Sequence, residues 1–411
     1  MSIMDVTVFP GALSGTVSAP SSKSFSHREL IAAALSQGTS RISGVSFSRD
    51  IEVTCGCLEA LGAKIQQNGT TFTVKGISQR GGRAVLDCGE SGSTLRFMMP
   101  VASALGAGAE FTGSGRLPER PYTTYVREMG SHGVTFSREQ GLPVALSGTL
   151  ESGDYYIEGD ISSQFVTGLM FALPLCEGDS RIHITSPLQS APYADMTVKT
   201  LEAHGIRVEK GVENGLEVFT IPGGQRYKGC DRTVEGDFSQ AAFFFVANAL
   251  GSDIQVSNLD MASVQGDRAI IDIIRSTEGC TKPFEADVSQ IPDLVPVLAV
   301  LASRCQGTSR LYNAARLRIK ESDRLTTTAA ALNSIGADVR IGDDELVIRH
   351  VDRFTGGTVD GANDHRIVMA AAVAALSAEG AVTIKGAQAV NKSYPGFFDD
   401  LRSLGAKCKS Q

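Results

Sequence analysis

The sequence lacks the features that mark membrane proteins, nucleic-acid coats and secreted proteins. No apolar run approaches the length of about 20 residues that a membrane-spanning helix needs. Lys and Arg number 38 against 45 Asp and Glu, which gives a net charge of −7. Sequence-independent binding to nucleic acid needs many basic side chains on phosphates, so this balance argues against it. The first basic residue is Lys23, so we expect no secretory signal.

Cysteine is scarce and scattered. The chain has 8 Cys in 411 residues, and none of them forms a CxxC pair. The 6 His residues show no metal-ligand spacing either. This pattern predicts a reduced cytosolic protein, without a disulfide framework or a zinc site.

What the sequence does have is enough apolar material for a large core. Hydrophobic residues make up 42% and charged residues 20% of the chain, which excludes intrinsic disorder. At roughly 100–200 residues per domain, the length predicts two or three domains.

One type of segment recurs six times: a polar opening, an Ala-rich apolar stretch and a Gly near its end. The copies are Ser24–Gly38, Gly92–Gly106, Ser162–Gly178, Ser239–Gly251, Ile291–Gly307 and Asn363–Gly380. Ser, Asp or Asn near most of the starts is a candidate N-cap, and Gly suits the position after a helix. Each copy is predicted to be a mostly buried helix.

A second type of segment also recurs six times, offset from the first. Each copy is amphipathic and ends in Gly followed by a short apolar alternation, at Gly62, Gly133, Gly205, Gly279, Gly336 and Gly405. Successive glycines are separated by nearly equal stretches of chain, except that the interval from Gly279 to Gly336 is shorter. We interpret each copy as a helix, a Gly C-cap and a strand.

These two series predict an α/β protein built from six similar βα units. The last unit is about 20 residues short, counted against the repeat. We infer that residues 1–20, with a strand-like run at 4–10, complete it. This gives one domain over 21–232 and a discontinuous domain of 1–20 plus 233–411, with a hinge where the chain crosses twice.

Basic and small polar residues gather at the predicted helix starts. They are Lys23, Ser24 and Arg28; Gly92, Ser93 and Arg96; Ser162, Ser163 and Gln164; and His365 and Arg366. Helix N-termini offer free N–H groups and a positive dipole end to phosphate or carboxylate. The alternative is that Ser and Asn are only caps, but several such sites together favour an anionic small molecule as partner.

Two acidic positions are candidates for proton transfer. In the segment 316–324, Lys320 and Glu321 stand side by side, where mutual charge and burial can tune their pKa values; the alternative is a solvated helix start. Asp293 opens an otherwise apolar helix, either as an N-cap or as a general base. The SSKS run at 21–24 lacks the preceding glycines of a P-loop, so we discount ATP binding.

Ten motifs in order resemble the 5-enolpyruvylshikimate-3-phosphate synthase family. They are SSKSFSHR (21–28), GESGSTLR (89–96), LPERP (117–121), SSQF (162–165), SAPY (190–193), VEGDFSQA (234–241), IPD (291–293), RIKESDR (318–324), NDHR (363–366) and NKSYPGF (391–397). The resemblance implies two inside-out α/β domains, each of three βαβαββ pseudo-repeats, joined by a two-stranded hinge. It also implies an active site in the cleft between the domains.

The resemblance implies transfer of the enolpyruvyl group of phosphoenolpyruvate to the 5-hydroxyl of shikimate 3-phosphate, with release of phosphate. No metal or organic cofactor is expected. The implied shikimate 3-phosphate residues are Lys23, Ser24, Arg28, Ser162, Ser163, Gln164, Ser190, Tyr193, Asp293, Arg316 and Lys320. The implied phosphoenolpyruvate residues are Lys23, Gly92, Arg120, Gln164, Arg324, Arg366 and Lys392, and the implied catalytic residues are Lys23, Asp293, Lys320 and Glu321.

Several positions depart from the family pattern, among them Glu90 and Arg316. The family usually has Asn where this chain has Glu90, and an acid beside a phosphate site is unexpected. Arg316 stands where many members have Asn, which adds a contact to the shikimate phosphate.

Other functions fit the sequence less well. The related transferase that uses UDP-N-acetylglucosamine typically carries a reactive Cys in the loop before its RP motif, and the loop at 113–121 has none. A non-enzymatic ring such as a sliding clamp would spread basic residues along its inner helices. We expect a cytoplasmic monomer that binds neither nucleic acid nor membrane.

Overall fold

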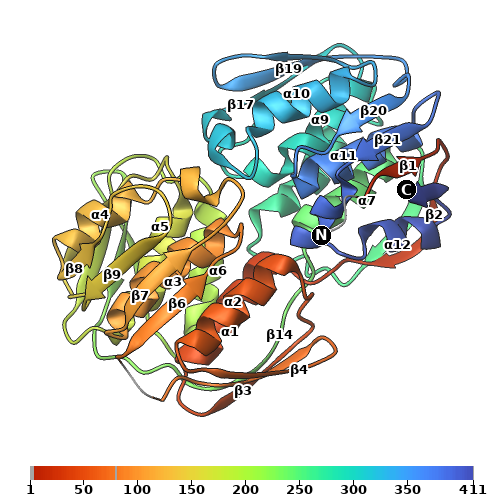
Figure 1. The fold of residues 1–411 in the computed structure, drawn as a ribbon. Helices are drawn as coiled ribbons and strands as arrows, with labels where there is room; N and C mark the ends of the chain where they lie inside the picture. The colour runs from red at the N-terminus through yellow and green to blue at the C-terminus, as the bar shows by residue number, and fades with distance from the viewer. Residues whose placement is uncertain (1–3, 79–80, 411) are drawn as a thin grey trace. The chain divides into compact units, whose positions relative to one another are not determined.

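The computed structural model describes residues 4–78 and 81–410, and it divides the chain into two compact units. The central unit is Ser21–Glu235, and the discontinuous unit joins Met1–Pro20 to Gly236–Gln411. The predicted fold class, a mixed α/β protein, is confirmed. Every sheet in the described residues lies within one unit (Figure 1).

The central unit contains six α-helices and three sheets in its described residues. The helices are α1 (Lys23–Leu35), α2 (Arg49–Ala60), α3 (Gly92–Ala104), α4 (Thr123–Gly130), α5 (Ser163–Ala172) and α6 (Ala191–Ala203). The strands are β3 (Thr39–Ser43), β4 (Lys64–Asn68), β5 (Thr71–Lys75), β6 (Arg83–Asp87), β7 (Gly108–Thr112), β8 (Val134–Phe136), β9 (Val144–Gly148), β10 (Asp154–Ile157), β11 (Ser180–Ile184), β12 (Glu209–Glu213), β13 (Leu216–Ile221) and β14 (Asp231–Thr233).

The three sheets of the central unit share one topology. Their strand orders are β14-β3-β5-β4, β6-β7-β9-β8 and β10-β11-β13-β12. In each sheet the first two strands are parallel and the other pairings are antiparallel. Two of the three repeats, β6 to β9 and β10 to β13, therefore have the chain order βαβαββ, whereas the first repeat takes its outer parallel strand, β14, from the end of the central unit. Because β14 pairs with β3, the central unit continues to Glu235 rather than ending near residue 232.

The discontinuous unit contains the helices α7 (Phe238–Ala249), α8 (Ile270–Ser276), α9 (Val295–Arg304), α10 (Arg324–Asn333), α11 (His365–Leu376) and α12 (Phe397–Ser403). Its strands are β1 (Val6–Val8), β2 (Ser14–Ser18), β15 (Asp253–Ser257), β16 (Glu285–Asp287), β17 (Thr308–Tyr312), β18 (Asp338–Ile341), β19 (Glu345–Arg349), β20 (Gly357–Asp360), β21 (Val382–Lys385) and β22 (Cys408–Ser410). Strand β1 lies between β21 and β22, so the N-terminal segment completes the last of the six repeats, as predicted from the sequence.

One of the six βα repeats is smaller than the others. Strand β2 also comes from the N-terminal segment, and it pairs in parallel with β15 to form a sheet of only two strands. The strand predicted after Gly279 is wrong, because residues 278–280 all have left-handed backbone angles, with φ of 48°, 71° and 64°. Successive left-handed residues turn the chain sharply and do not extend it. The missing strand pair also accounts for the shorter interval between Gly279 and Gly336.

The six helices predicted to be mostly buried form the interior of the two units. In α3, for example, every residue from Thr94 to Ala104 is buried, whereas the strands bury only alternate residues, as in β7. A helix that is apolar all round must lie inside, and a strand with one polar face can face water. Helices therefore lie inside and sheets outside, which is the inside-out arrangement.

Most of the predicted N-caps and the glycines of the second series are confirmed, whereas Gly178 and Gly380 of the first series lack a left-handed φ. Side chains of Ser22, Ser91, Ser162, Asp237 and Asp364 accept the capping hydrogen bonds of α1, α3, α5, α7 and α11. All six glycines of the second series have φ between 71° and 103°, the region in which an L side chain is strained. Among the described residues, none of the helices is long and apolar enough to cross a membrane.

Candidate active site

In the central unit, the starts of α1, α2 and α3 are connected by polar contacts. Lys23 Nζ lies 2.7 Å from Asp50 Oδ2 at the start of α2. His27 Nδ1 lies 2.8 Å from Thr54 Oγ1, which lies 2.7 Å from Thr94 Oγ1 on α3. Burial lowers the pKa of His27 well below its ordinary value, helped by the charges of Lys23 and Arg28. Since His27 is neutral at neutral pH, the positive charge at this helix start comes from its neighbours.

The starts of α3 and α5 are joined by one amide side chain. Arg96 Nη1 donates to Gln164 Oε1 at 2.7 Å, and Gln164 Nε2 donates to Ser93 Oγ at 2.8 Å. The guanidinium of Arg96 is 2% exposed and stacks on the Phe165 ring at 5.1 Å. Gln164 is therefore held between two helices, with Ser162 and Ser163 beside it at the N-terminus of α5.

Arg120 lies directly against the first residue of α3. A Cβ atom added to Gly92 would lie 2.3 Å from Arg120 Nη1 and 2.4 Å from Cζ. Only glycine lets the guanidinium approach the helix start this closely. Glu90 packs against Gly115 in the following loop, where an added Cβ would lie 2.6 Å from Glu90 Oε2.

Arg28 is more buried than the resemblance suggests for a ligand-binding side chain. Its guanidinium is 2% exposed and donates to Ser24 O and Tyr193 O, both at 2.8 Å, and to Thr197 Oγ1 at 2.9 Å. Burial lowers the pKa of Arg28 to about 10. In this structure Arg28 ties α1 to α6. The N-cap residue of α6 is Ser190, which is buried and left-handed with φ of 56°.

In the discontinuous unit, one carboxylate collects the basic side chains. Arg324 Nη1 donates to Asp293 Oδ1 at 2.8 Å, and Arg366 Nη2 donates to Asp293 Oδ2 at 2.9 Å. Lys320 Nζ lies 3.7 Å from Asp293 Oδ1. Asp293 lies inside a 3-10 turn, and the N-cap position of α9 belongs to Leu294, so the N-cap interpretation is wrong.

Arg324 is the centre of this cluster. It is 1% exposed and also donates to Glu321 Oε2 at 2.7 Å and to Asp364 Oδ2 at 2.8 Å. Burial alone would raise the pKa of Asp364, but Arg324 and His365 lower it overall. Three carboxylates from three chain segments therefore fix a single guanidinium.

Lys320 and Lys392 bring further charge to this unit. Burial lowers the pKa of Lys320 to about 8, against the opposing effect of Asp293. Lys392 Nζ donates to Asn363 O at 2.7 Å, beside the start of α11. Arg316 lies in the 3-10 turn Ala315–Ile319, one turn of chain before Lys320. The predicted residues of this unit thus gather around Asp293 and the start of α11.

Asp267 is a buried acid that the sequence did not single out. It is 4% exposed and accepts a hydrogen bond from Ser239 Oγ, while its Oδ1 has no hydrogen-bond partner in the described structure. Burial and the nearby charge of Asp293 raise the pKa of Asp267 to about 7. Asp267 therefore adds a half-protonated carboxyl group beside the cluster at neutral pH.

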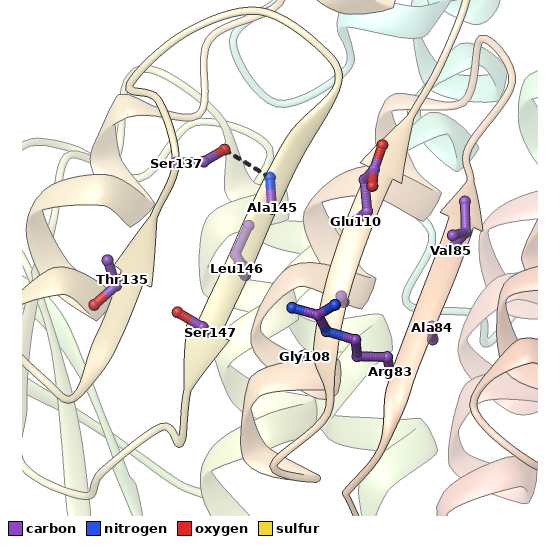
Figure 2. Close-up of a pocket in the computed structure, with 11 residues that line it drawn as sticks. Arg83, Ala84, Val85, Gly108, Glu110, Thr135, Ser137, Ala145, Leu146 and Ser147 are labelled. Atoms are coloured by element: carbon purple, nitrogen blue, oxygen red, sulfur yellow. Dashed lines mark hydrogen bonds between the residues drawn. The ribbon is translucent and has the colours of Figure 1, made fainter.

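The chemistry of these residues suits anion binding and proton transfer. Among the described residues, no group of three or more His, Cys, Asp or Glu could hold a metal ion. A hollow of about 540 Å³ on the outer face of the sheet β6-β7-β9-β8 has a different character. Figure 2 shows it lined by small side chains with one Arg and one Glu, Arg83 and Glu110, which do not make an anion site.

Comparison with known proteins gives the family. The model of EPSP synthase (3-phosphoshikimate 1-carboxyvinyltransferase) matches residues 9–401. The chain belongs to the EPSP synthase family. Two curated relatives named 3-phosphoshikimate 1-carboxyvinyltransferase come from Clostridium kluyveri and Clostridium acetobutylicum. They are 46% and 42% identical, covering 98% and 97% of this chain and 97% of each relative.

Solved structures support the EPSP synthase fold. An EPSP synthase from Acinetobacter baumannii matches with a TM-score of 0.82 at 24% identity, covering 99% of this chain and all of that one. The enolpyruvyl transferase NikO from Streptomyces tendae matches with a TM-score of 0.79 at 18% identity, covering 100% of this chain and 99% of that one. The resemblance inferred from the ten motifs is confirmed.

For a member of the EPSP synthase family, the sequence reasoning missed the acidic partners of the basic residues. Asp50 pairs with Lys23, and Asp364 holds Arg324. Asp364 belongs to the motif NDHR, where its position before a helix predicts a cap, which it also provides. Asp50 and Asp267 carry no local signal, because their partners come from distant segments.

Proposed function

We propose that this chain transfers the enolpyruvyl group of phosphoenolpyruvate to the 5-hydroxyl of shikimate 3-phosphate and releases phosphate. The observation that carries the proposal is the Asp293 cluster, in which Arg324, Arg366 and Lys320 surround a single carboxylate. Such a cluster suits a substrate that has both a carboxylate and a phosphate, because each guanidinium binds two oxygens.

In this proposal phosphoenolpyruvate is held by residues from both units, most of them basic. Arg324, Arg366 and Lys392 come from the discontinuous unit, and Lys23, Gly92, Arg120 and Gln164 come from the central unit. Those that lie at helix starts, such as Lys23, Gly92 and Arg324, add free N–H groups and the positive end of the helix dipole. Asp293 occupies the guanidinium groups of Arg324 and Arg366 before substrate arrives, so the anion must displace it.

Shikimate 3-phosphate is held mainly by the central unit. Ser162 and Ser163 at the start of α5 bind its phosphate, and Gln164 and Tyr193 contact the ring. Ser24, Arg28 and Ser190 complete this side, with Lys23, Asp293, Arg316 and Lys320 as further contacts. Since Arg28 donates to the carbonyl oxygens of Ser24 and Tyr193, it also positions these two residues.

The reaction needs an acid and a base that exchange roles. The 5-hydroxyl attacks C2 of phosphoenolpyruvate while C3 takes a proton, and the resulting tetrahedral ketal then loses a C3 proton and phosphate. Asp293 and Glu321 supply the two carboxylates, and both contact Arg324. Lys320 and Lys23 assist by stabilising charge on the reacting oxygens.

The two sets of residues must serve one active site, so the two units close over the substrates at a hinge. The chain crosses between units at Pro20–Ser21 and Glu235–Gly236. In the central unit Ser22 N–H donates to Glu235 O, and in the discontinuous unit Asp237 N–H donates to Pro20 O, both at 2.8 Å. Closure excludes water, which strengthens the ion pairs and prevents hydrolysis.

The remaining assignments follow from the substrates. Both are multiply charged and cross a lipid bilayer very slowly, so we propose that the enzyme works in the cytoplasm, where they are made. One chain supplies every residue named above, so we propose that a monomer suffices. Carboxylates and cations of the protein provide the acid, the base and the charge stabilisation, so the proposal requires no cofactor.

The test is phosphate release from phosphoenolpyruvate with shikimate 3-phosphate, with UDP-N-acetylglucosamine as the comparison acceptor. We expect release with shikimate 3-phosphate alone. In Glu321→Gln, which keeps the shape but removes the proton-transfer group, kcat is expected to fall roughly 10²–10⁴-fold. Release with UDP-N-acetylglucosamine, or with neither acceptor from a folded protein, would refute the proposal.

A further inference from the structure

Cys280 and Cys305 lie side by side in the discontinuous unit, although β16 and α9 separate them in the sequence. Cys280 lies in the left-handed turn that follows α8, where the smaller unit lacks its strand pair. Cys305 is the C-cap residue of α9. The N–H of Gln306 donates to the carbonyl oxygen of Cys280 at 3.0 Å, so the two backbones are in direct contact.

The Cys280 thiol donates to the carbonyl oxygen of Ala249 at 3.8 Å, and it also interacts with the thiol of Cys305. Cys305 is 0% exposed, whereas Cys280 is partly exposed. The interaction with Cys305 lowers the pKa of Cys280 to about 7, aided by the Thr277 hydroxyl and the charge of Arg304 and opposed by burial. The same interaction raises the pKa of Cys305. Cys280 is thus the nucleophile and Cys305 the proton donor.

We propose that Cys280 and Cys305 form a redox-active dithiol, which a small disulfide oxidant converts into an intramolecular disulfide that fastens the end of α9. This modification site lies outside the residues assigned to the transferase reaction. It does not depend on the proposed function.

The chemistry is thiol–disulfide exchange in two steps. The Cys280 thiolate attacks one sulfur of the oxidant RSSR, forming a mixed disulfide with R and releasing RS⁻. The Cys305 sulfur then attacks the Cys280 sulfur while its proton passes to the departing thiolate, releasing RSH. The two cysteines lose two electrons in total, and the oxidant gains them as one thiolate and one thiol.

The disulfide would stabilise the unit without closing the active site. It would link the loop after α8 to the C-terminal end of α9, and Asp293 lies before the N-terminal end of that helix. A helix of 10 residues places these ends roughly 15 Å apart. We therefore expect oxidation to raise the melting temperature and to leave phosphate release within about twofold of the reduced protein.

The central unit contains a second thiol pair that serves as an internal control. The thiols of Cys57 and Cys88 also interact, but the two residues are 1% and 0% exposed. The interaction with Cys57 and burial raise the pKa of Cys88 well above its ordinary value. A dissolved oxidant should therefore distinguish the two pairs by accessibility and by charge.

The experiment treats the reduced full-length protein with oxidised glutathione at pH 7, alkylates the remaining thiols and maps the peptides by mass spectrometry. We expect the Cys280–Cys305 linkage, six alkylatable thiols after denaturation instead of eight, and alkylated Cys57 and Cys88. In Cys305→Ser the reaction should stop at a glutathione adduct on Cys280. In Cys280→Ser neither position should react.

Three results would overturn the proposal. The first is wild-type protein that keeps all eight thiols, or that carries only the Cys280 adduct. The second is oxidation of Cys57 and Cys88 at the same rate, which would show that unfolding exposes both pairs. The third is a disulfide that forms but lowers the melting temperature or abolishes phosphate release.

Discussion

Lys320 has a pKa well below that of an ordinary lysine. Burial lowers its pKa to about 8, and the positive charges of Arg316 and Arg324 act in the same direction. Asp293, 3.7 Å away, opposes them. At neutral pH most of the Lys320 amine is therefore charged, but within one or two pH units it becomes neutral.

The pH dependence of the rate follows from this pKa. If the cationic form of Lys320 is the working form, kcat/KM for phosphoenolpyruvate should fall above about pH 8, by up to tenfold per pH unit. In Lys320→Arg the guanidinium stays charged, so the basic limb should move beyond pH 9 even where the rate is lower. Rates measured from pH 6 to 10 check this, and exposed Lys282→Arg is the control. An unchanged basic limb in Lys320→Arg would contradict the assignment.

Gly92 lies where a side chain would collide with the guanidinium of Arg120. It lacks a positive φ, so alanine fits the helix backbone, but the new Cβ would lie 2.3 Å from Arg120 Nη1. We expect Gly92→Ala to displace Arg120 and to raise the KM for phosphoenolpyruvate roughly 10–100-fold, the effect of losing one charge-assisted hydrogen bond. Steady-state kinetics test this. Gly56→Ala, with open space around it, should leave KM unchanged.

At the scale of elements, Asp364 joins the ends of two helices. Its Oδ1 caps α11 at Arg366 N, 3.0 Å away, and its Oδ2 accepts from Arg324 at the start of α10. A carboxylate that is 0% exposed is tolerated because these contacts replace water. Asp364 therefore holds the two arginines of the Asp293 cluster in a fixed relation.

Removing the charge of Asp364 should lower stability by about 3 kcal/mol, the typical cost of breaking a buried pair. The pKa of Asp364 is lowered by folding, so its contribution is present above the unfolded value near 4 and is lost as pH falls through the folded pKa. Chemical denaturation of Asp364→Asn should therefore differ from wild type at pH 7, with the difference shrinking only in acid. The exposed Asp399→Asn is the control, and an equally stable Asp364→Asn would contradict this role.

Elements also show where local patterns mislead. The six buried helices and five of the six following strands were predictable, because an apolar stretch of helix length and a Gly C-cap are local signals. The exception is the segment after Gly279, where the alternation predicted a strand. The left-handed angles of Glu278 and Cys280 could not be foreseen, since neither residue type favours them.

At the scale of the whole molecule, the proposed function needs residues from two separate units. The basic residues assigned to the anions repel one another when no ligand is bound, so we propose that anion binding brings the two units together. Small-angle scattering of Glu321→Gln with both substrates is expected to show a smaller radius of gyration than the unliganded variant. The slow variant keeps the substrates bound during the measurement. Sodium chloride at matched ionic strength is the control, and equal radii would count against closure.

The sequence by itself determined the number of units, their helices, their caps and the polar motifs, because these depend on residues within a few turns of one another. Only the tertiary structure decided which charges meet. Lys23 pairs with Asp50, and Arg324 pairs with Asp293, Asp364 and Glu321. The thiol of Cys280 interacts with that of Cys305. Pairing of β2 with β15, which follows the whole central unit in the sequence, is of the same kind. Such contacts are fixed by the packing of the whole chain, and no local pattern records them.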